Sequence, residues 1–219
     1  DQLGFKGREA RILFRMFVCP VLNSIEPQPP MPLLPKLLLH VCCGPCATAS
    51  LERLRQEGEV TLFFSNGNLF PAAEHGRRLA AARQLAEASA AEFVVDAYDH
   101  AAWREFVRGL EDEPERGARC VRCFEFSFQR AARYAREHGF TGLATTLTIS
   151  PHKRSADIFR IGREVWDGFL EIDFKKRDGF RRSLELTKQL GLYRQDYCGC
   201  EFSLQAREQR KKQGMTENG

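Results

Sequence analysis

Short apolar runs alternate with longer amphipathic segments along most of the chain. The run from Leu37 to Val41 is continuous, as expected for a strand buried on both faces, whereas Leu51 and Leu54 recur at helical spacing. The pattern predicts five strands, at 37–41, 60–65, 92–97, 142–148 and 169–174. It predicts helices at 47–56, 72–90 and 101–110, from Cys120 onward, at 154–166 and at 183–190.

This alternation predicts the α/β fold class, with a Rossmann-like parallel sheet covered by helices on both faces. Ligands of such open sheets bind beyond the carboxyl ends of the strands. We therefore expect the functional site, including any metal site, at the carboxyl edge of the strands.

The two ends of the chain differ from the middle. Residues 1–30 lack a clear period and close with a proline-rich run at 27–30, so we expect an N-terminal extension that is disordered or precedes a natural start at Met31. A short amphipathic helix at 12–18 is the alternative. We expect a single α/β domain at 31–206 that carries the site, and a basic polar tail at 207–219.

Composition narrows the class of protein. Hydrophobic residues make up 43% of the 219 positions and charged residues 28%, as in ordinary globular proteins. The longest apolar runs are too short for a membrane span, and we expect a cytoplasmic protein with no membrane partner. The net charge of +4 permits a polyanionic partner without requiring one.

The eight cysteines change the picture most, because seven of them form three tight groups. Closely spaced thiols far apart in sequence indicate a metal site, since each group brings several ligands into one coordination sphere. One zinc ion or one cubane cluster uses four thiolates, so the remaining three favour a second metal. The groups are Cys42, Cys43 and Cys46; Cys120 and Cys123; and Cys198 and Cys200.

Other interpretations of the cysteines remain open at this point. Disulfides would require a secreted protein, but we find no secretory signal at the start, and the clustered count is odd. A structural zinc site alone would use four sulfurs and leave the others unexplained. Cys19 stands apart and is interpreted as an unpaired thiol.

The predicted topology places the cysteines at the carboxyl edge. Cys42, Cys43 and Cys46 follow the first strand and precede its helix, where the macrodipole lowers thiolate pKa values and favours a negatively charged cluster. Cys120 and Cys123, three residues apart, share one face of a first helical turn. Gly199 lets the backbone turn so that its two flanking cysteines face one centre.

Four motifs follow one another along the chain: LLLHVCCGPC at 37–46, CVRC at 120–123, TTL at 145–147 followed by Ser150-Pro151, and LYRQDYCGC at 192–200. The last motif is the most specific, while a CxxC pair alone would be weak. In order and spacing, from about Lys36 to Ser203, these motifs resemble the QueH family of epoxyqueuosine reductases.

This resemblance implies an oxidoreductase that reduces the epoxide of a modified wobble base in tRNA to an alkene, the last step of queuosine synthesis. It implies a 4Fe-4S cluster with an additional mononuclear iron, the tRNA anticodon loop as partner, and an electron donor that the sequence does not identify. All seven metal positions are occupied here by cysteine, although some relatives have aspartate at the position of Cys46. The implied partition gives Cys43, Cys120, Cys123 and one of Cys198 or Cys200 to the cluster, and the other three to the iron.

Two positions depart from the family pattern. Gly67 stands where proline is expected, and His152 where an aromatic residue is commoner. Neither is a metal position, so the departures concern contacts with the substrate.

Removing an epoxide oxygen requires two electrons, two protons and an acid near the metals. Asp196 and Tyr197 are our first candidates for that acid, ahead of His40 and Tyr193. Basic and polar residues near strand ends are candidates for contacts with tRNA phosphates and the base. The predicted substrate-binding residues are Asn66, Asn68, Thr145, Thr146, Ser150, Lys153, Lys175, Lys176, Arg177, Tyr193 and Arg194.

Three other function classes are compatible with part of this pattern. An ATP-using iron-sulfur enzyme that thiolates tRNA would share the α/β fold, but the phosphate loop that it needs after the first strand is replaced by the first cysteine group. A non-catalytic RNA-binding module would hold zinc. A thiol-disulfide oxidoreductase would need only one reactive CxxC.

Overall fold

The computed structural model describes residues 34–214. Its centre is a parallel sheet of four strands in the order β3-β2-β1-β4, so the chain crosses from one edge of the sheet to the other after β3. The strands are β1 (Lys36–His40), β2 (Glu59–Phe64), β3 (Glu92–Val95) and β4 (Gly142–Thr145).

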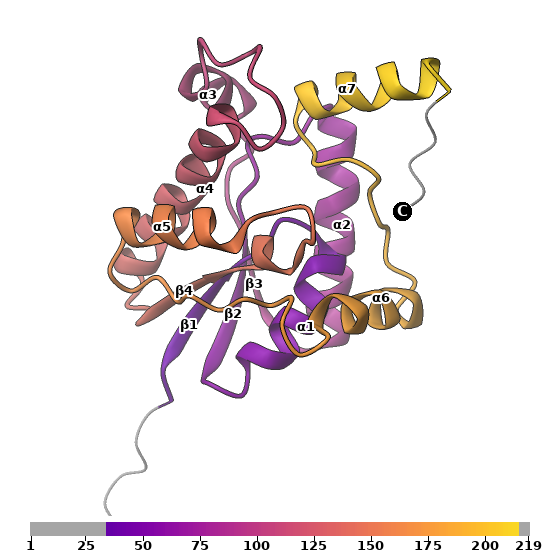
Figure 1. Cartoon of the computed structure of the whole chain (residues 1–219). Coiled ribbons are helices and arrows are strands. Elements are labelled where there is room, and N and C mark those ends of the chain that lie inside the picture. The colour runs from indigo at the N-terminus through magenta and orange to yellow at the C-terminus, as the bar shows by residue number, and fades with distance from the viewer. Residues whose placement is uncertain (1–33, 215–219) are drawn as a thin grey trace, which may run out of the picture. The chain divides into compact units, whose positions relative to one another are not determined.

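Helices cover both faces of this sheet (Figure 1). The expected Rossmann-like α/β class is therefore confirmed for the described residues. The helices are α1 (Gly44–Leu54), α2 (Ala72–Ala88), α3 (His100–Phe106), α4 (Ala118–Glu137), the 3-10 turn η2 (Thr146–Ile149), α5 (Ser155–Val165), α6 (Gly179–Gln189) and α7 (Glu201–Lys212). No helix within residues 34–214 is both long and apolar enough to cross a membrane.

Strand β1 shows why the sheet is buried on both sides. Leu37 and Leu39 point to one face and pack in a cluster with residues of α1 and α2, while Leu38 points to the other face and packs against α4 and α5. A strand of this kind reads as a continuous apolar run instead of an alternating one. The sheet therefore separates two hydrophobic cores and leaves its carboxyl edge free for chemistry.

One predicted strand is wrong. Residues 169–174 form no ladder, and the segment makes only an isolated bridge between Phe169 and Leu143. Its apolar residues serve packing instead of strand pairing, because Phe169 is buried in the core on the α4 side and Phe174 in the core on the α1 side. The strand predicted at 142–148 is shorter than expected: it ends at Thr145, and η2 begins at Thr146.

The C-terminal helix was not predicted. Helix α7 is mostly polar and runs from Glu201 to Lys212, across the boundary expected at residue 206. Few of its residues are buried, so it lacks the apolar stripe on which a sequence-based prediction depends. The boundary expected near residue 30 lies outside the described residues.

A close contact between helices fixes the start of α1. At Gly44, an added Cβ would lie 2.5 Å from the backbone oxygen of Ala81 in α2, so only glycine allows this approach. Pro45 follows in the first turn, where its missing N–H costs nothing. The local sequence therefore places the first cysteine group at a fixed point beyond β1.

Candidate metal centre and active-site cavity

Three thiols gather at the junction of β1 and α1. The sulfur atoms of Cys42, Cys43 and Cys46 all lie within 4.8 Å of one another, and we call these residues the three-thiol group. Cys43 is the N-cap residue of α1, with extended backbone, and Cys46 lies in the first turn. All three are free thiols. Three sulfurs at this separation can share one coordination sphere.

Side chains from distant segments donate to these sulfurs. The hydroxyl of Thr146 lies 3.3 Å from Cys42 Sγ and also accepts the backbone N–H of Cys42 at 3.1 Å. The amide Nε2 of Gln195 donates to Cys43 Sγ at 3.1 Å. Donors of this kind orient thiolate ligands and tune a metal that they bind.

The three thiols do not share one protonation state. The pKa of Cys43 is lowered well below its usual value, chiefly because Cys42 and Cys46 donate to its sulfur. The bond with Cys43 raises the pKa of Cys42 to about 11, and the bonds with Cys42 and Cys43 hold the pKa of Cys46 well above its usual value. The group therefore holds one thiolate readily, and metal binding would displace the other protons.

Four further thiols come from two other segments, and we call them the four-thiol group. Cys120 and Cys123 lie in the first turns of α4, and Cys198 and Cys200 flank Gly199 in the loop before α7. Burial, together with the sulfurs of Cys200 and Cys198, raises the pKa of Cys123 well above its usual value, and burial raises that of Cys120 to about 11. The two segments lie near each other, because Cys200 and Cys123 pack in one cluster, but only the three-thiol group among the described residues has its sulfurs within 4.8 Å of one another.

A buried ion pair holds the loop at 198–200, which we call the CGC loop. Arg78 of α2 donates to the backbone oxygens of Cys198 and Tyr197 at 2.9 and 3.1 Å. Its Nε donates at 2.7 Å to Glu74, which is fully buried and also accepts the hydroxyl of Tyr193. Helix α2 therefore positions two sulfurs that lie 120 residues further along the chain.

The glycine of the CGC loop is required by its surroundings. Gly199 has φ +129°, and an added Cβ would lie 2.5 Å from Leu69 and 2.8 Å from a guanidinium nitrogen of Arg78. No other residue type fits both the dihedral and the space. The backbone turn expected at this glycine is thus confirmed, while a common centre for the two flanking sulfurs stays a prediction.

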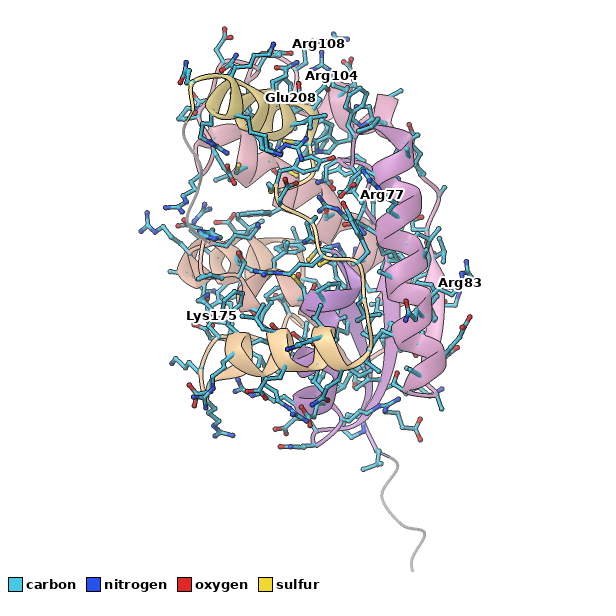
Figure 2. The ribbon with its side chains drawn as sticks, turned by 90° about the vertical axis from the view of Figure 1, so that its right-hand side faces the viewer. Arg77, Arg83, Arg104, Arg108, Lys175 and Glu208 are labelled. Atoms are coloured by element: carbon cyan, nitrogen blue, oxygen red, sulfur yellow. The ribbon has the colours of Figure 1, made fainter. Side chains whose placement is uncertain are left out.

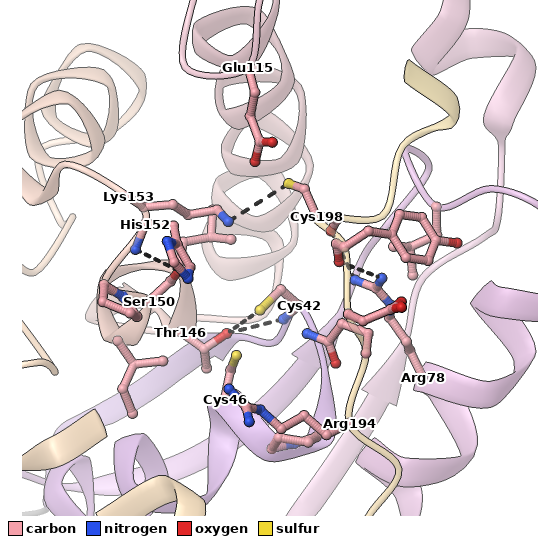
Figure 3. Close-up of a pocket in the computed structure, with 18 of the residues that line it drawn as sticks. Cys42, Cys46, Arg78, Glu115, Thr146, Ser150, His152, Lys153, Arg194 and Cys198 are labelled. Atoms are coloured by element: carbon pink, nitrogen blue, oxygen red, sulfur yellow. Dashed lines mark hydrogen bonds between the residues drawn. The ribbon is translucent and has the colours of Figure 1, made fainter. Parts of the chain in front are cut away.

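Two cations face both thiol groups. The sulfurs of Cys43 and Cys198 both act on Arg78. The ammonium of Lys153 lies 3.7 Å from Cys198 Sγ, and the sulfurs of Cys198, Cys42 and Cys46 raise its pKa. Figure 3 shows Lys153 directed toward Cys198, with Cys42 and Cys46 on the other side of the opening. Cys198 is the thiol that both cations face.

Both thiol groups open into one cavity of about 930 Å³. This volume is within the range for small-ligand sites. Many of the residues predicted from the sequence line it, and they come from the ends of β1, β2 and β4 and from the loop before α7. The predicted residues in the lining are Cys42, Cys46, Asn66, Asn68, Cys123, Thr146, Ser150, Lys153, Arg194, Asp196, Tyr197 and Cys198.

The two candidate acids have different environments. Burial would raise the pKa of Asp196, but Arg207 and Lys211 donate to its carboxylate at 2.6 and 3.3 Å and lower it. The hydroxyl of Tyr197 donates to the backbone oxygen of Phe70 at 2.6 Å, and burial raises its pKa to about 12. Asp196 is therefore ionised in this arrangement, and Tyr197 keeps its proton.

Several predicted substrate-binding residues have structural contacts instead. Asn66 donates to the backbone oxygen of Val41, and the hydroxyl of Thr145 lies 2.9 Å from Nδ1 of the buried His40. Neither Thr145 nor Tyr193 lines the cavity. The hydroxyl of Tyr193 donates to Glu74. These groups shape the edge of the sheet and hold the CGC loop.

The basic run at 175–177 is divided by its contacts. Lys175 Nζ bonds to Ser155 Oγ at 2.6 Å and to the backbone oxygen of Thr148 at 2.8 Å, so its donors are used within the protein. Lys176 and Arg177 are exposed beside the start of α6. Figure 2 shows Lys175 on the same side of the molecule, near α6. Within this run, Lys176 and Arg177 are the residues whose side chains keep free donors for a phosphate.

Several residues that position the cysteines were not predicted from the sequence. Glu74 and Arg78 lie on α2, where a charged pair four residues apart looks like an ordinary exposed helix pair. Gln195 lies inside the last motif, next to predicted residues, and its contact with Cys43 depends on tertiary structure. No sequence signal marks Glu115, which reaches the cavity from the loop before α4.

Comparison with known proteins now gives the family. The family model described as epoxyqueuosine reductase QueH matches residues 37–206. The chain is 40% identical over 179 residues to the epoxyqueuosine reductase QueH of Streptococcus pyogenes serotype M1, covering 77% of this chain and 70% of that protein. It is 34% identical to the QueH of Staphylococcus epidermidis, covering 77% and 76%, and 31% identical to that of Thermotoga maritima, covering 84% and 97%. The chain belongs to the QueH family of epoxyqueuosine reductases, a family of oxidoreductases.

Proposed function

We propose that this protein reduces epoxyqueuosine at the wobble position of tRNA to queuosine. The observation that carries the proposal is one cavity, of a size for a modified nucleoside, into which both thiol groups open. A reductase needs its electron source beside the substrate, and thiolate sites that hold iron-sulfur clusters supply electrons. The names of the relatives agree with this chemistry.

The thiols fit a 4Fe-4S cluster with an additional iron. Seven free cysteines in groups of three and four provide sulfur ligands, and four thiolates are the usual ligand set of a 4Fe-4S cluster. Cys200 packs with Cys123 and Trp103, whereas Cys198 faces Lys153 across from Cys42 and Cys46. We therefore assign Cys198, Cys42 and Cys46 to the iron. The cluster takes the remaining four, Cys43, Cys120, Cys123 and Cys200.

The reaction breaks both C–O bonds of the epoxide and forms a C=C bond. Two electrons from an external one-electron reductant and two protons balance the oxygen, which leaves as water. When bound, the metals supply the electrons and a Lewis-acidic site. The chain's own residues do the rest: Thr146 and Gln195 hold the thiolates in orientation, and the cavity positions the base.

Of the two acids expected from the sequence, Tyr197 is the better proton holder. Its hydroxyl is protonated at neutral pH, while Asp196 is an ionised partner of Arg207 and Lys211. Asp196 then orients α7 over the cavity mouth, which Arg207 and Lys211 also line. This division of roles keeps both residues at the site but leaves only one as a proton donor.

The tRNA contacts are assigned to the basic groups that keep free donors. Lys176 and Arg177 lie outside the cavity, and Arg194 lies at its lining with its guanidinium over the ring of Phe180. Phosphates of an anticodon loop would contact such groups while the modified base enters the cavity. We retain the expected domain organisation, with a catalytic α/β domain preceded by an extension, as part of this proposal.

Metal analysis followed by an assay tests the proposal. Protein purified and reconstituted without oxygen should contain more than about four irons per chain with labile sulfide. With a chemical one-electron reductant, it should convert epoxyqueuosine in tRNA to queuosine, as read by mass spectrometry of the nucleosides. Zinc without sulfide, together with no loss of the epoxide, would contradict the proposal and favour a zinc-binding RNA module.

A further inference from the structure

The ammonium of Lys153 is the unexplained charge in the cavity. Among residues 34–214 its ammonium makes one hydrogen bond, to Cys198 Sγ at 3.7 Å, and no carboxylate lies within ion-pair distance of it. A lysine ammonium has three N–H donors. A half-buried cation with most of its donors unused is costly unless a ligand completes its contacts.

The loop that carries Lys153 is held firmly from behind. The backbone N–H of Lys153 donates to Ser150 at 3.3 Å, and Lys175 Nζ donates to the backbone oxygen of Lys153 at 3.4 Å. Lys175 also binds Thr148 and Ser155 on either side. The ammonium is therefore directed inward by a fixed backbone, and Figure 3 shows it pointing across the cavity.

The ammonium of Lys153 is surrounded mainly by sulfur atoms. Cys198 from the CGC loop, Cys42 and Cys46 from the three-thiol group, and Glu115 from the loop before α4 all act on it. Lys153 was expected from the sequence to contact a tRNA phosphate. Lys153 instead lies between the two thiol groups, and the epoxide must bind there if it is to receive electrons from metals held by these thiols.

We propose that Lys153 is a catalytic residue that holds the epoxide oxygen. Its N–H groups donate to that oxygen, and its charge stabilises the negative charge that develops there as the C–O bonds break. In this role Lys153 gives up no proton, so the two protons of the released water come from Tyr197 and from solvent, and the two electrons come from the external one-electron reductant. This inference rests on the proposed epoxide reduction and adds a residue to it.

The test compares three variants with the native protein after anaerobic metal loading. Lys153→Met removes the charge and keeps the chain length, and Lys153→Arg keeps a cation. Lys188→Met, on the exposed side of α6, is the matched control that removes a lysine outside the cavity. Three quantities are measured: iron and sulfide per chain, the Kd for tRNA with and without the epoxide nucleoside, and the single-turnover rate with enzyme in excess over tRNA and the one-electron reductant present throughout.

The expected result separates chemistry from binding. Lys153→Met should retain its iron and sulfide. Its Kd for unmodified tRNA should stay within about twofold of that of the native protein, because the substitution removes no contact with tRNA. Its single-turnover rate should fall by about 10²–10³-fold, the effect of removing one donor to a developing oxyanion. Lys153→Arg should recover part of the rate, and Lys188→Met should behave as native.

Two results would overturn the inference. An unchanged single-turnover rate with weaker binding of both tRNAs would make Lys153 a phosphate contact. Loss of iron or sulfide in both Lys153 variants would make it a structural counter-charge for the thiolates. The proposed function fails separately, because in that case the native, metal-loaded protein itself would leave the epoxide unchanged.

Discussion

The two thiol groups are held in place by different means. The three-thiol group lies within five residues at the end of β1, and the backbone of one strand-to-helix junction sets its geometry. The four-thiol group joins the start of α4 to the CGC loop, and the loop depends on Arg78 and Glu74 of a third element. Local sequence thus fixes one half of the site, and long-range contacts fix the other.

Serine substitutions in the two groups should separate them most strongly. Cys42→Ser should remove about one iron per chain and leave labile sulfide intact, because it removes a ligand of the lone iron. Cys123→Ser should remove about four irons together with the sulfide. Both changes should abolish epoxide reduction. Iron and sulfide analysis after anaerobic reconstitution measures the difference.

Cys46→Asp is the control for this pair of substitutions. A carboxylate can ligate iron in place of a thiolate, so this variant should keep its full iron content and sulfide. Equal losses from Cys42→Ser and Cys123→Ser would show that the seven thiols form one unit and would remove the distinction between the groups.

Breaking the ion pair behind the CGC loop should have the next largest effect. Arg78→Met removes the buried one of the two arginine partners of Glu74 and leaves it only Arg77, whose side chain is exposed. We therefore expect a cost of about 3 kcal/mol in free energy of unfolding, the lower end for breaking a buried ion pair. Urea denaturation of the metal-free protein measures this. Sulfide content should fall as well, because the carbonyls of Tyr197 and Cys198 lose their donors.

The control for Arg78 lies on the same helix. Arg83 is exposed on α2 and rests over the ring of Phe93, so Arg83→Met should cost at most about 1 kcal/mol. The double variant Glu74→Met/Arg78→Met should recover part of the stability lost in Arg78→Met, because it leaves no unpaired buried charge. Similar free energies for Arg78→Met and Arg83→Met would refute the role of the pair.

Substituting the glycine of the CGC loop should have a smaller effect on the same group. Gly199→Ala forces a side chain into a left-handed dihedral and against Leu69, and we expect a cost of about 1–3 kcal/mol with reduced sulfide content. Gly191 also has a positive φ, of +60°, but an added Cβ there meets nothing within 4 Å. Gly191→Ala should therefore lose some stability in thermal denaturation yet keep its sulfide, and loss of sulfide in both would contradict the argument.

The same contrast explains what the sequence could predict. The apolar run of β1 and the cysteines that follow it are contiguous, so both the strand and its thiols could be placed at the carboxyl edge. The resemblance implied that Cys120 and Cys123 share a cluster with Cys43 and one cysteine of the CGC loop, and this partition stays a prediction. The predicted strand at 169–174 failed because burial in two cores produces the same apolar pattern as strand pairing.

Side-chain direction was beyond the sequence. Lys153 and Lys175 both lie near the ends of predicted elements. The side chain of Lys153 points into the cavity, whereas that of Lys175 donates to a backbone oxygen and a serine hydroxyl. The acid Asp196 is likewise paired with two residues of α7, a helix without a sequence signal. Such partners are set by packing between segments, and a one-dimensional pattern does not record them.

The smallest expected effect concerns the environment of the four-thiol group. The buried indole N–H of Trp103 is directed at the sulfur of Cys123 and lowers its pKa against the effect of burial, although its geometry falls short of a full hydrogen bond. An N–H near a cluster sulfur stabilises the more negative, reduced state. Trp103→Phe should therefore retain iron and sulfide while the midpoint potential of the cluster, measured by a spectroscopic redox titration, becomes more negative. Phe202 packs against Trp103 and has no N–H, so Phe202→Leu provides the control. That variant changes the packing around Trp103 and the stacking of Arg104 and Arg119 but removes no N–H. A shift of equal size in both variants would assign the effect to these surroundings and leave the indole N–H without a role.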